Sequence, residues 1–136
     1  MKREKTAVVT GGSSGMGLAI ARRLASEGIN VIVFDIQAPP DDFTFFRIDI
    51  RNDDQIKAAL SNIESVDILV NNAGIYFEKY LEDTTNDEID DMVDINIKGT
   101  YLMTRDAFPK IKASRGCVII IASCLGLVPE LTSPLY

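Results

Sequence analysis

A glycine-rich segment near the start of the chain has residues suited to binding phosphate groups. Residues 10–17 read TGGSSGMG and lie between a short β-rich run and an amphipathic helical pattern. Glycines let the backbone turn tightly and let a pyrophosphate approach, and the N-terminus of a helix attracts negative charge. An ordinary turn between a strand and a helix is the alternative for this segment taken alone. The residues expected to provide donors or space for a phosphate group are Gly11, Ser13, Ser14, Gly15, Met16 and Gly17.

An acidic residue follows at a spacing that suits a ribose. Asp35 closes the second β-rich run, 18 residues after Gly17. A carboxylate at about this distance can accept hydrogen bonds from ribose hydroxyls, whereas it would repel a 2′-phosphate. The next residue is Ile36, and no Arg or Lys interrupts the glycine segment. The pattern therefore predicts NAD as cofactor and disfavours NADP, although a solvated strand end is a common alternative for a single Asp.

The composition of the chain argues against several classes of function. The chain has 136 residues, a net charge of -6, two cysteines and no histidine. The acidic balance argues against a nucleic-acid partner, which requires a basic surface. Without histidine, neither Ser–His catalysis nor a Cys/His metal site can be assembled, so no metal is expected. No run is long enough for a membrane span and no signal peptide is recognisable, so no membrane partner is expected. The two cysteines do not suggest a disulfide framework, so reduced thiols and a cytoplasmic location are expected.

The elements that must position these residues alternate along the chain. Helical spacing of apolar residues predicts a helix after the glycine segment that ends near Gly28, another after Asn52, and a long one from Thr85 to about Lys112. This alternation predicts one α/β domain with a parallel sheet and helices on both faces. The predicted strands are Ala7–Thr10, Asn30–Asp35, residues 43–50, Asp67–Val70 and Cys117–Ala122, the last expected to be buried on both faces.

Several motifs together resemble the short-chain dehydrogenase/reductase family, and the resemblance runs from Thr6 to Tyr136. The glycines have that family's spacing, NNAG follows the fourth predicted strand, and DINIKGTY lies in the long predicted helix. Ser123 follows the fifth predicted strand, and Tyr136 comes 13 residues later. The resemblance implies a Rossmann-type, doubly wound fold and further cofactor contacts from Asp49, Ile50, Asn72, Ala73 and Gly74.

The resemblance also implies an activity, which is hydride transfer between a nicotinamide cofactor and an alcohol or ketone. Tyr136 corresponds to the family's acid/base, Ser123 to the residue that holds the substrate oxygen, and Asn96 to an anchor for a water in a proton relay. In the family a lysine four residues after the tyrosine lowers the tyrosine's pKa, because nearby positive charge favours the phenolate. The 136 residues contain no such position, so they are expected to form a single NAD(P)-binding domain that lacks the family's C-terminal strands and helices.

A chain that stopped at Tyr136 is therefore expected to have little hydride-transfer activity. A non-catalytic dinucleotide-binding module and an inactive fragment remain the alternatives to an oxidoreductase. Each candidate residue alone has an ordinary explanation, and the ordered set favours the enzyme.

Three smaller expectations complete the sequence prediction. Cys117 and Cys124 are expected to be reduced and partly buried. The aromatic residues after NNAG are expected to pack a loop, with a place in a pocket as the alternative; they are Tyr76, Phe77 and Tyr80. The long helix carries apolar residues that one sheet face does not obviously cover, which predicts a homo-oligomer; they are Tyr101, Leu102, Phe108 and Ile111.

Overall fold

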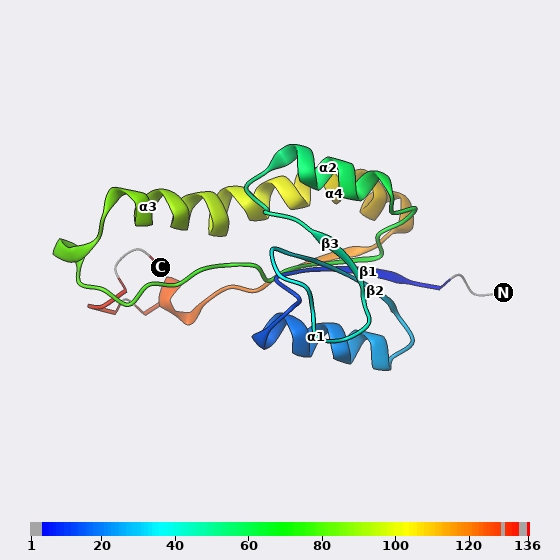
Figure 1. Ribbon diagram of the computed structural model, residues 1–136, viewed down its shortest axis with the longest axis horizontal. Coiled ribbons are helices and arrows are strands. Elements are labelled where there is room, and N and C mark those ends of the chain that lie inside the picture. The colour runs from blue at the N-terminus through cyan, green and yellow to red at the C-terminus, as the bar shows by residue number, and fades with distance from the viewer. Residues whose placement is uncertain (1–3, 129, 134–135) are drawn as a thin grey trace.

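The computed structural model describes residues 4–128, 130–133 and 136, and its central feature is a five-stranded parallel sheet (Figure 1). The strand order is β3-β2-β1-β4-β5. The strands β2 and β3 therefore lie on one side of β1, and β4 and β5 lie on its other side. The strands are β1 (Thr6–Thr10), β2 (Asn30–Asp35), β3 (Thr44–Arg47), β4 (Ile68–Asn71) and β5 (Cys117–Ile120). The helices are α1 (Gly15–Ser26), α2 (Asp53–Ser61), α3 (Asn86–Met92), the π-helical η2 (Val93–Gly99) and α4 (Thr100–Ser114), with short 3₁₀ turns η1 (Leu81–Asp83) and η3 (Cys124–Gly126).

Helices cover both faces of the sheet, as the alternating pattern predicts. Figure 1 shows α1 on one side of the sheet and α2 and α4 on the other. Successive residues of a strand point to opposite faces, so Val8 belongs to the core beneath α2 and α4, while Val9 packs in the core on the α1 side. This two-sided burial explains why the central strands are apolar throughout instead of alternating with polar residues.

The helices begin where the sequence predicts. The Asn52 side chain accepts a hydrogen bond from the backbone N–H of Gln55 at 3.1 Å and so caps α2. Thr85 and Glu88 form a capping box at the start of α3. From there α3, η2 and α4 follow one another without a break, so the predicted long helix is confirmed, with a π-helical segment in its middle.

Two strand predictions need correction. The third strand is only four residues long, because the chain turns toward the cap of α2 after Ile48. The Ile48 N–H still donates to the Asp35 carbonyl of β2, whereas the Asn52 N–H donates to the Asp49 carbonyl within the turn. The fifth strand is not buried on both faces, since β5 is an edge of the sheet among the described residues and its Ile120 side chain is 57% exposed.

The expectations for the cysteines and the long helix are also partly wrong. Cys117 and Cys124 are free, but both are exposed, because Cys117 lies on the edge strand and Cys124 in the 3₁₀ turn beyond it. In α4, Leu102 and Ile111 are buried against the sheet, and only Tyr101 and Phe108 of the four apolar residues remain exposed. No helix in the described part of the chain is long and apolar enough to cross a membrane.

Candidate active site

A large cavity opens at the carboxyl ends of the strands in the described part of the chain. It has a volume of about 1050 Å³ and is lined by residues that follow each of the five strands and by part of the long helix. In open parallel sheets, ligands bind where neighbouring strands send the chain in opposite directions, which here is between β1 and β4. Of the predicted site residues, those that line this cavity are Gly11, Ser14, Gly15, Met16, Asp35, Asp49, Ile50, Asn72, Ala73, Gly74, Asn96, Ser123 and Tyr136.

The glycine turn owes its shape to close backbone packing. Gly11 has φ +63°, and a Cβ atom at this position would lie 2.9 Å from the Ala73 Cα. A Cβ at Gly17 would lie 2.1 Å from the Gly11 carbonyl oxygen, so α1 can approach the turn only through a glycine. Gly17 does not line the cavity, and its place in the site is therefore that of a packing residue behind the turn.

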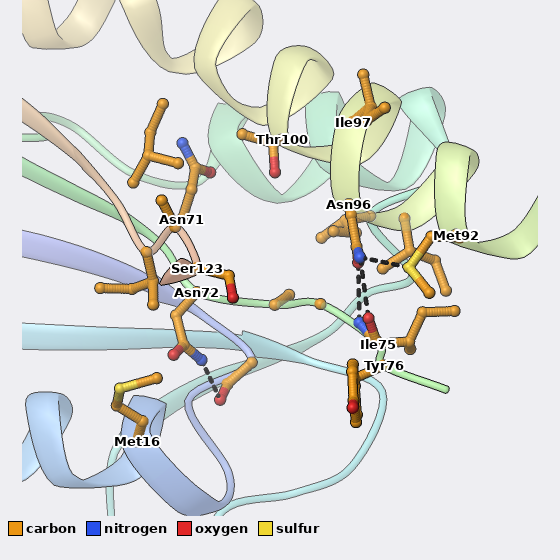
Figure 2. Close-up of a pocket in the computed structure, with 18 of the residues that line it drawn as sticks. Met16, Asn71, Asn72, Ile75, Tyr76, Met92, Asn96, Ile97, Thr100 and Ser123 are labelled. Atoms are coloured by element: carbon orange, nitrogen blue, oxygen red, sulfur yellow. Dashed lines mark hydrogen bonds between the residues drawn. The ribbon is translucent and has the colours of Figure 1, made fainter. Parts of the chain in front are cut away.

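The turn after β1 is fastened to the turn after β4 by side chains. The Thr10 hydroxyl oxygen accepts hydrogen bonds from the backbone N–H groups of Asn72 and Ala73, both at 3.0 Å. The Asn72 carboxamide in turn donates to the carbonyls of Thr10 and Gly11, both at 3.1 Å. Figure 2 shows one hydrogen bond that Asn72 donates. The NNAG segment thus acts on the site chiefly by holding the glycine turn in place.

The start of α1 leaves room for an anion. A Cβ built at Gly15 would meet no atom within 4 Å, and Gly15 lines the cavity. Ser14 precedes the helix but forms no side-chain hydrogen bond to its first turn, and that turn contains no acidic residue. These features fit a phosphate group lying against the positive end of the helix dipole.

Asp35 lies at the far side of this turn and already has backbone partners. Its two carboxylate oxygens accept hydrogen bonds from the N–H groups of Ser13 (2.9 Å) and Gln37 (3.1 Å). Each carboxylate oxygen can accept more than one bond, so the group remains able to receive ribose hydroxyls. The Ser13 hydroxyl donates to the Gln37 carbonyl at 2.5 Å, and Ser13 lies outside the cavity wall, so its predicted phosphate contact stays a prediction.

A basic residue that the sequence analysis did not single out lines the same wall. The Arg51 guanidinium contacts both carboxylate oxygens of Asp49, and it also donates to Asp91 of α3 at 2.8 Å. The hydrogen bond from Arg51 holds the pKa of Asp49 below its ordinary value, so this carboxylate stays ionised. Because Arg51 lies two residues after Asp49, the contact between these two residues could have been predicted from the sequence. Its contact with Asp91 of α3 is seen only in the folded structure.

Asn96 lies in the π-helical segment η2 and holds the loop that follows NNAG. Its carboxamide oxygen accepts from the Ile75 N–H at 2.8 Å, and its nitrogen donates to the Ile75 carbonyl at 2.9 Å. Figure 2 shows this side chain reaching from the helix to Ile75, with Met92 beside it. One side chain thereby satisfies both backbone groups of a loop residue, a role that the sequence analysis did not assign to it.

The two remaining candidate residues come from the C-terminal part of the chain. The Ser123 hydroxyl oxygen accepts a hydrogen bond from the Leu125 N–H at 3.1 Å, and a hydroxyl can still donate while it accepts. Tyr136 is 40% exposed, and its ring contacts the ring of Tyr76. Tyr76 also lines the cavity, so the pocket alternative for this aromatic residue is confirmed.

Comparison with known proteins agrees with this geometry. The family model for short chain dehydrogenase matches residues 5–136. The chain belongs to that family. It is 36% identical to a short-chain dehydrogenase/reductase of Penicillium roqueforti over 97% of this chain and 44% of that protein.

Solved structures of dehydrogenases share the fold of this family member. The ligand-free aldohexose dehydrogenase of Thermoplasma acidophilum superposes with a TM-score of 0.93 and 33% identity, over 98% of this chain and 55% of that one. A short chain dehydrogenase of Leptospira borgpetersenii with bound NAD+ gives a TM-score of 0.88 and 29% identity, over 94% and 55% of the two chains. The chain spans about half the length of the relatives it matches.

One buried polar atom in the cavity wall points to a ligand or water in this family member. The Asn71 side chain is 3% exposed and donates to the Thr104 hydroxyl at 2.9 Å, but its carboxamide oxygen has no hydrogen-bond partner. An unpaired buried acceptor is costly, so a donor from the cavity is expected there. Together with the room at Gly15 and the carboxylate of Asp35, this acceptor suits a dinucleotide that fills the cavity.

Proposed function

We propose that the protein is an NAD-dependent oxidoreductase that transfers a hydride between NAD(H) and an alcohol or ketone substrate. The observation that carries the proposal is the cavity itself. One continuous surface contains the glycine turn and Asp35 together with Ser123 and Tyr136. Phosphate-binding and ribose-binding groups thus lie in the same cavity as two hydroxyl groups that suit proton transfer.

Asp35 supports the choice of NAD over NADP. Its carboxylate is fixed by two backbone N–H groups at the end of β2, where it would accept ribose hydroxyls and repel a 2′-phosphate. No described basic side chain adjoins it in sequence, since its neighbours are Phe34 and Ile36. The bound NAD+ of the Leptospira relative is in keeping with this choice.

The residues of this chain supply the proton chemistry. When bound, the nicotinamide ring supplies or accepts the hydride. The Ser123 hydroxyl would donate a hydrogen bond to the substrate oxygen and stabilise the negative charge that develops on it. The Tyr136 hydroxyl would pass a proton to or from the same oxygen as general acid/base. Asn96 would anchor a water in the proton relay, and its bonds to Ile75 also shape the wall beside Tyr136.

The proposal includes a homo-oligomer in the cytoplasm. Exposed apolar side chains recur along η2 and α4, at Ile97, Tyr101 and Phe108, and contiguous patches of this kind often mark contacts between subunits. Two exposed, free cysteines are in keeping with a reducing compartment. Asp87 and Asp90 of α3 are exposed, and no group of possible metal ligands occurs within the described ranges.

The test uses the protein expressed from its full coding sequence. NADH and NADPH are titrated by fluorescence, and turnover is measured on a panel of secondary alcohols and ketones. NADH should bind more tightly than NADPH, and Tyr136→Phe should lower kcat by about 10²–10⁴-fold, the usual contribution of a general acid/base, without loss of NADH affinity. Ser123→Ala is the matched change on the other hydroxyl. Tight NADH binding with no turnover on any substrate would favour the non-catalytic module instead.

A further inference from the structure

Tyr136 lines the cavity, and its ring packs against another side chain of the cavity wall. A side chain that donates or accepts a proton must stay within hydrogen-bond reach of the reacting oxygen. Side chains in contact with the Tyr136 ring therefore influence where its hydroxyl lies.

Tyr76 provides two of these contacts. Its ring meets the ring of Tyr136 edge to face, with centroids 5.1 Å apart and an interplanar angle of 79°. Its hydroxyl lies 2.6 Å from the hydroxyl of Ser133, which is only 4% exposed and precedes Tyr136 in the C-terminal segment. A third bond joins the same two segments, from the Lys79 N–H to the Thr132 carbonyl at 2.7 Å. The segment that carries Tyr136 is thus fastened to the loop after NNAG.

The loop is itself anchored to the long helix one residue earlier. Asn96 bonds both backbone groups of Ile75, so the backbone leading into Tyr76 has a fixed direction (Figure 2). Tyr76 also lines the cavity together with Tyr136. A path of direct contacts therefore runs from the π-helical segment through Ile75 and Tyr76 to the ring of Tyr136.

We propose that Tyr76 is a positioning residue for Tyr136. This inference rests on the proposed function, in which Tyr136 is the acid/base. An edge-to-face contact restricts the tilt of a tyrosine ring, and the bond to Ser133 restricts the segment behind it. Misplacement of a reacting group by about 1 Å can cost roughly 10²-fold in rate. Loss of Tyr76 should therefore lower turnover, whereas cofactor affinity, which depends on the opposite wall of the cavity, should be preserved.

Kinetic variants of the full-length protein test the role. Tyr76→Leu should lower kcat by about 10- to 100-fold and leave the Kd for NADH within about twofold. Tyr76→Phe keeps the ring contact and should restore most of the rate. Tyr80→Leu is the matched control, because Tyr80 lies on the same loop, is exposed and does not line the cavity. A kcat for Tyr76→Leu equal to that of the control would overturn the inference.

A direct readout separates this inference from the proposed function. The Tyr136 ring signal is assigned in the NMR spectrum of the protein labelled with ¹³C-tyrosine, using Tyr136→Phe. It should shift in Tyr76→Leu, since the neighbouring ring current is lost, and stay in place in Tyr80→Leu. An unmoved signal would contradict the contact, while a moved signal with unchanged kcat would contradict its role in positioning. Full turnover by Tyr136→Phe would instead refute the acid/base role, and the inference with it.

Discussion

The two walls of the cavity are built in different ways. The wall formed by the glycine turn, Asp35 and the NNAG segment follows strands in the centre of the sheet, and Thr10, which fastens it, is 1% exposed. The wall that carries Ser123 and Tyr136 follows β5, which lies at the edge of the sheet among the described residues, and loop contacts join its parts, including the one between Tyr76 and Ser133. Among the described residues, the first wall is the one that is built into the packed core of the fold.

This difference suggests that one wall serves dinucleotide binding, which is common to many enzymes, and the other serves the substrate, which varies between them. A dinucleotide has a constant shape, so the groups that bind it can be part of the core and rigid. Substrates differ from one enzyme to another, and loops on a scaffold can vary without loss of the core. Changes in the first wall should therefore affect global stability and cofactor binding together, while changes in the second should affect turnover with little effect on stability.

The largest effect is expected at Thr10. Thr10→Val keeps the shape of the side chain but removes the oxygen that accepts from Asn72 and Ala73. At roughly 1–3 kcal/mol for each of the two unsatisfied donors, the free energy of unfolding should fall by about 2–6 kcal/mol, and NADH affinity should fall with it. Urea unfolding and fluorescence titration measure the two quantities.

Thr10→Ser is the control for this prediction, because it keeps the oxygen and removes only a methyl group. It should cost about 1 kcal/mol. Equal losses for the two variants would show that packing of the methyl group, and not the bonds to the NNAG segment, holds this wall together.

A smaller loss is expected at Gly17. Helix propensity alone predicts that Gly17→Ala in α1 would stabilise the protein by about 1 kcal/mol. The added Cβ would however lie 2.1 Å from the Gly11 carbonyl oxygen, so strain should prevail and the free energy of unfolding should fall by about 1–3 kcal/mol. Gly126→Ala, where the Cβ meets open space on the other wall, should leave the urea midpoint unchanged. A gain in stability for Gly17→Ala would mean that the turn can move away from α1.

The smallest effect is expected at Glu88, which does not line the cavity but binds the loop of the second wall. The Glu88 carboxylate pairs with Lys79 of the loop at 2.6 Å and accepts from the Thr85 N–H at 3.0 Å. The hydrogen bond from Lys79, followed by that from the Thr85 backbone, lowers the pKa of Glu88 from 4.5 to about 2. A lowered pKa in the folded state means that the stabilising contribution is present above pH 4.5 and is lost as the pH falls toward 2.

Comparison with Glu88→Gln isolates this contribution. The wild type should be the more stable protein at pH 7, and the difference between the two urea midpoints should shrink below pH 4.5. A difference that stays constant with pH would show that the charge of Glu88 contributes nothing beyond the hydrogen bonds of the capping box.

Much of the first wall could be predicted from the sequence because it depends on local rules. Glycines at fixed spacing between a strand and a helix, and an acid at the end of the next strand, each report a conformation of nearby backbone. The expected residues did come together at one cavity, apart from Ser13 and Gly17, which lie behind its surface. The family itself followed from the same motifs and is confirmed by the comparison.

The second wall was harder to predict because its contacts join segments far apart in the chain. Nothing local indicates that Tyr76 meets Tyr136 or that Asn96 bonds both backbone groups of Ile75. The error for the fifth strand has the same origin, since an apolar run looks alike in the centre and at the edge of a sheet.

By itself, then, the sequence determined the order of strands and helices, the parallel sheet, the cofactor turn and the family, because periodicity and turn chemistry act over a few residues. Only the tertiary structure decided that Arg51 links Asp49 to α3, that Asn96 anchors a loop, and that Tyr76 adjoins Tyr136. These contacts depend on how the long helix and the C-terminal segment pack over the strand ends. That packing is a property of the whole fold, and short-range patterns do not encode it.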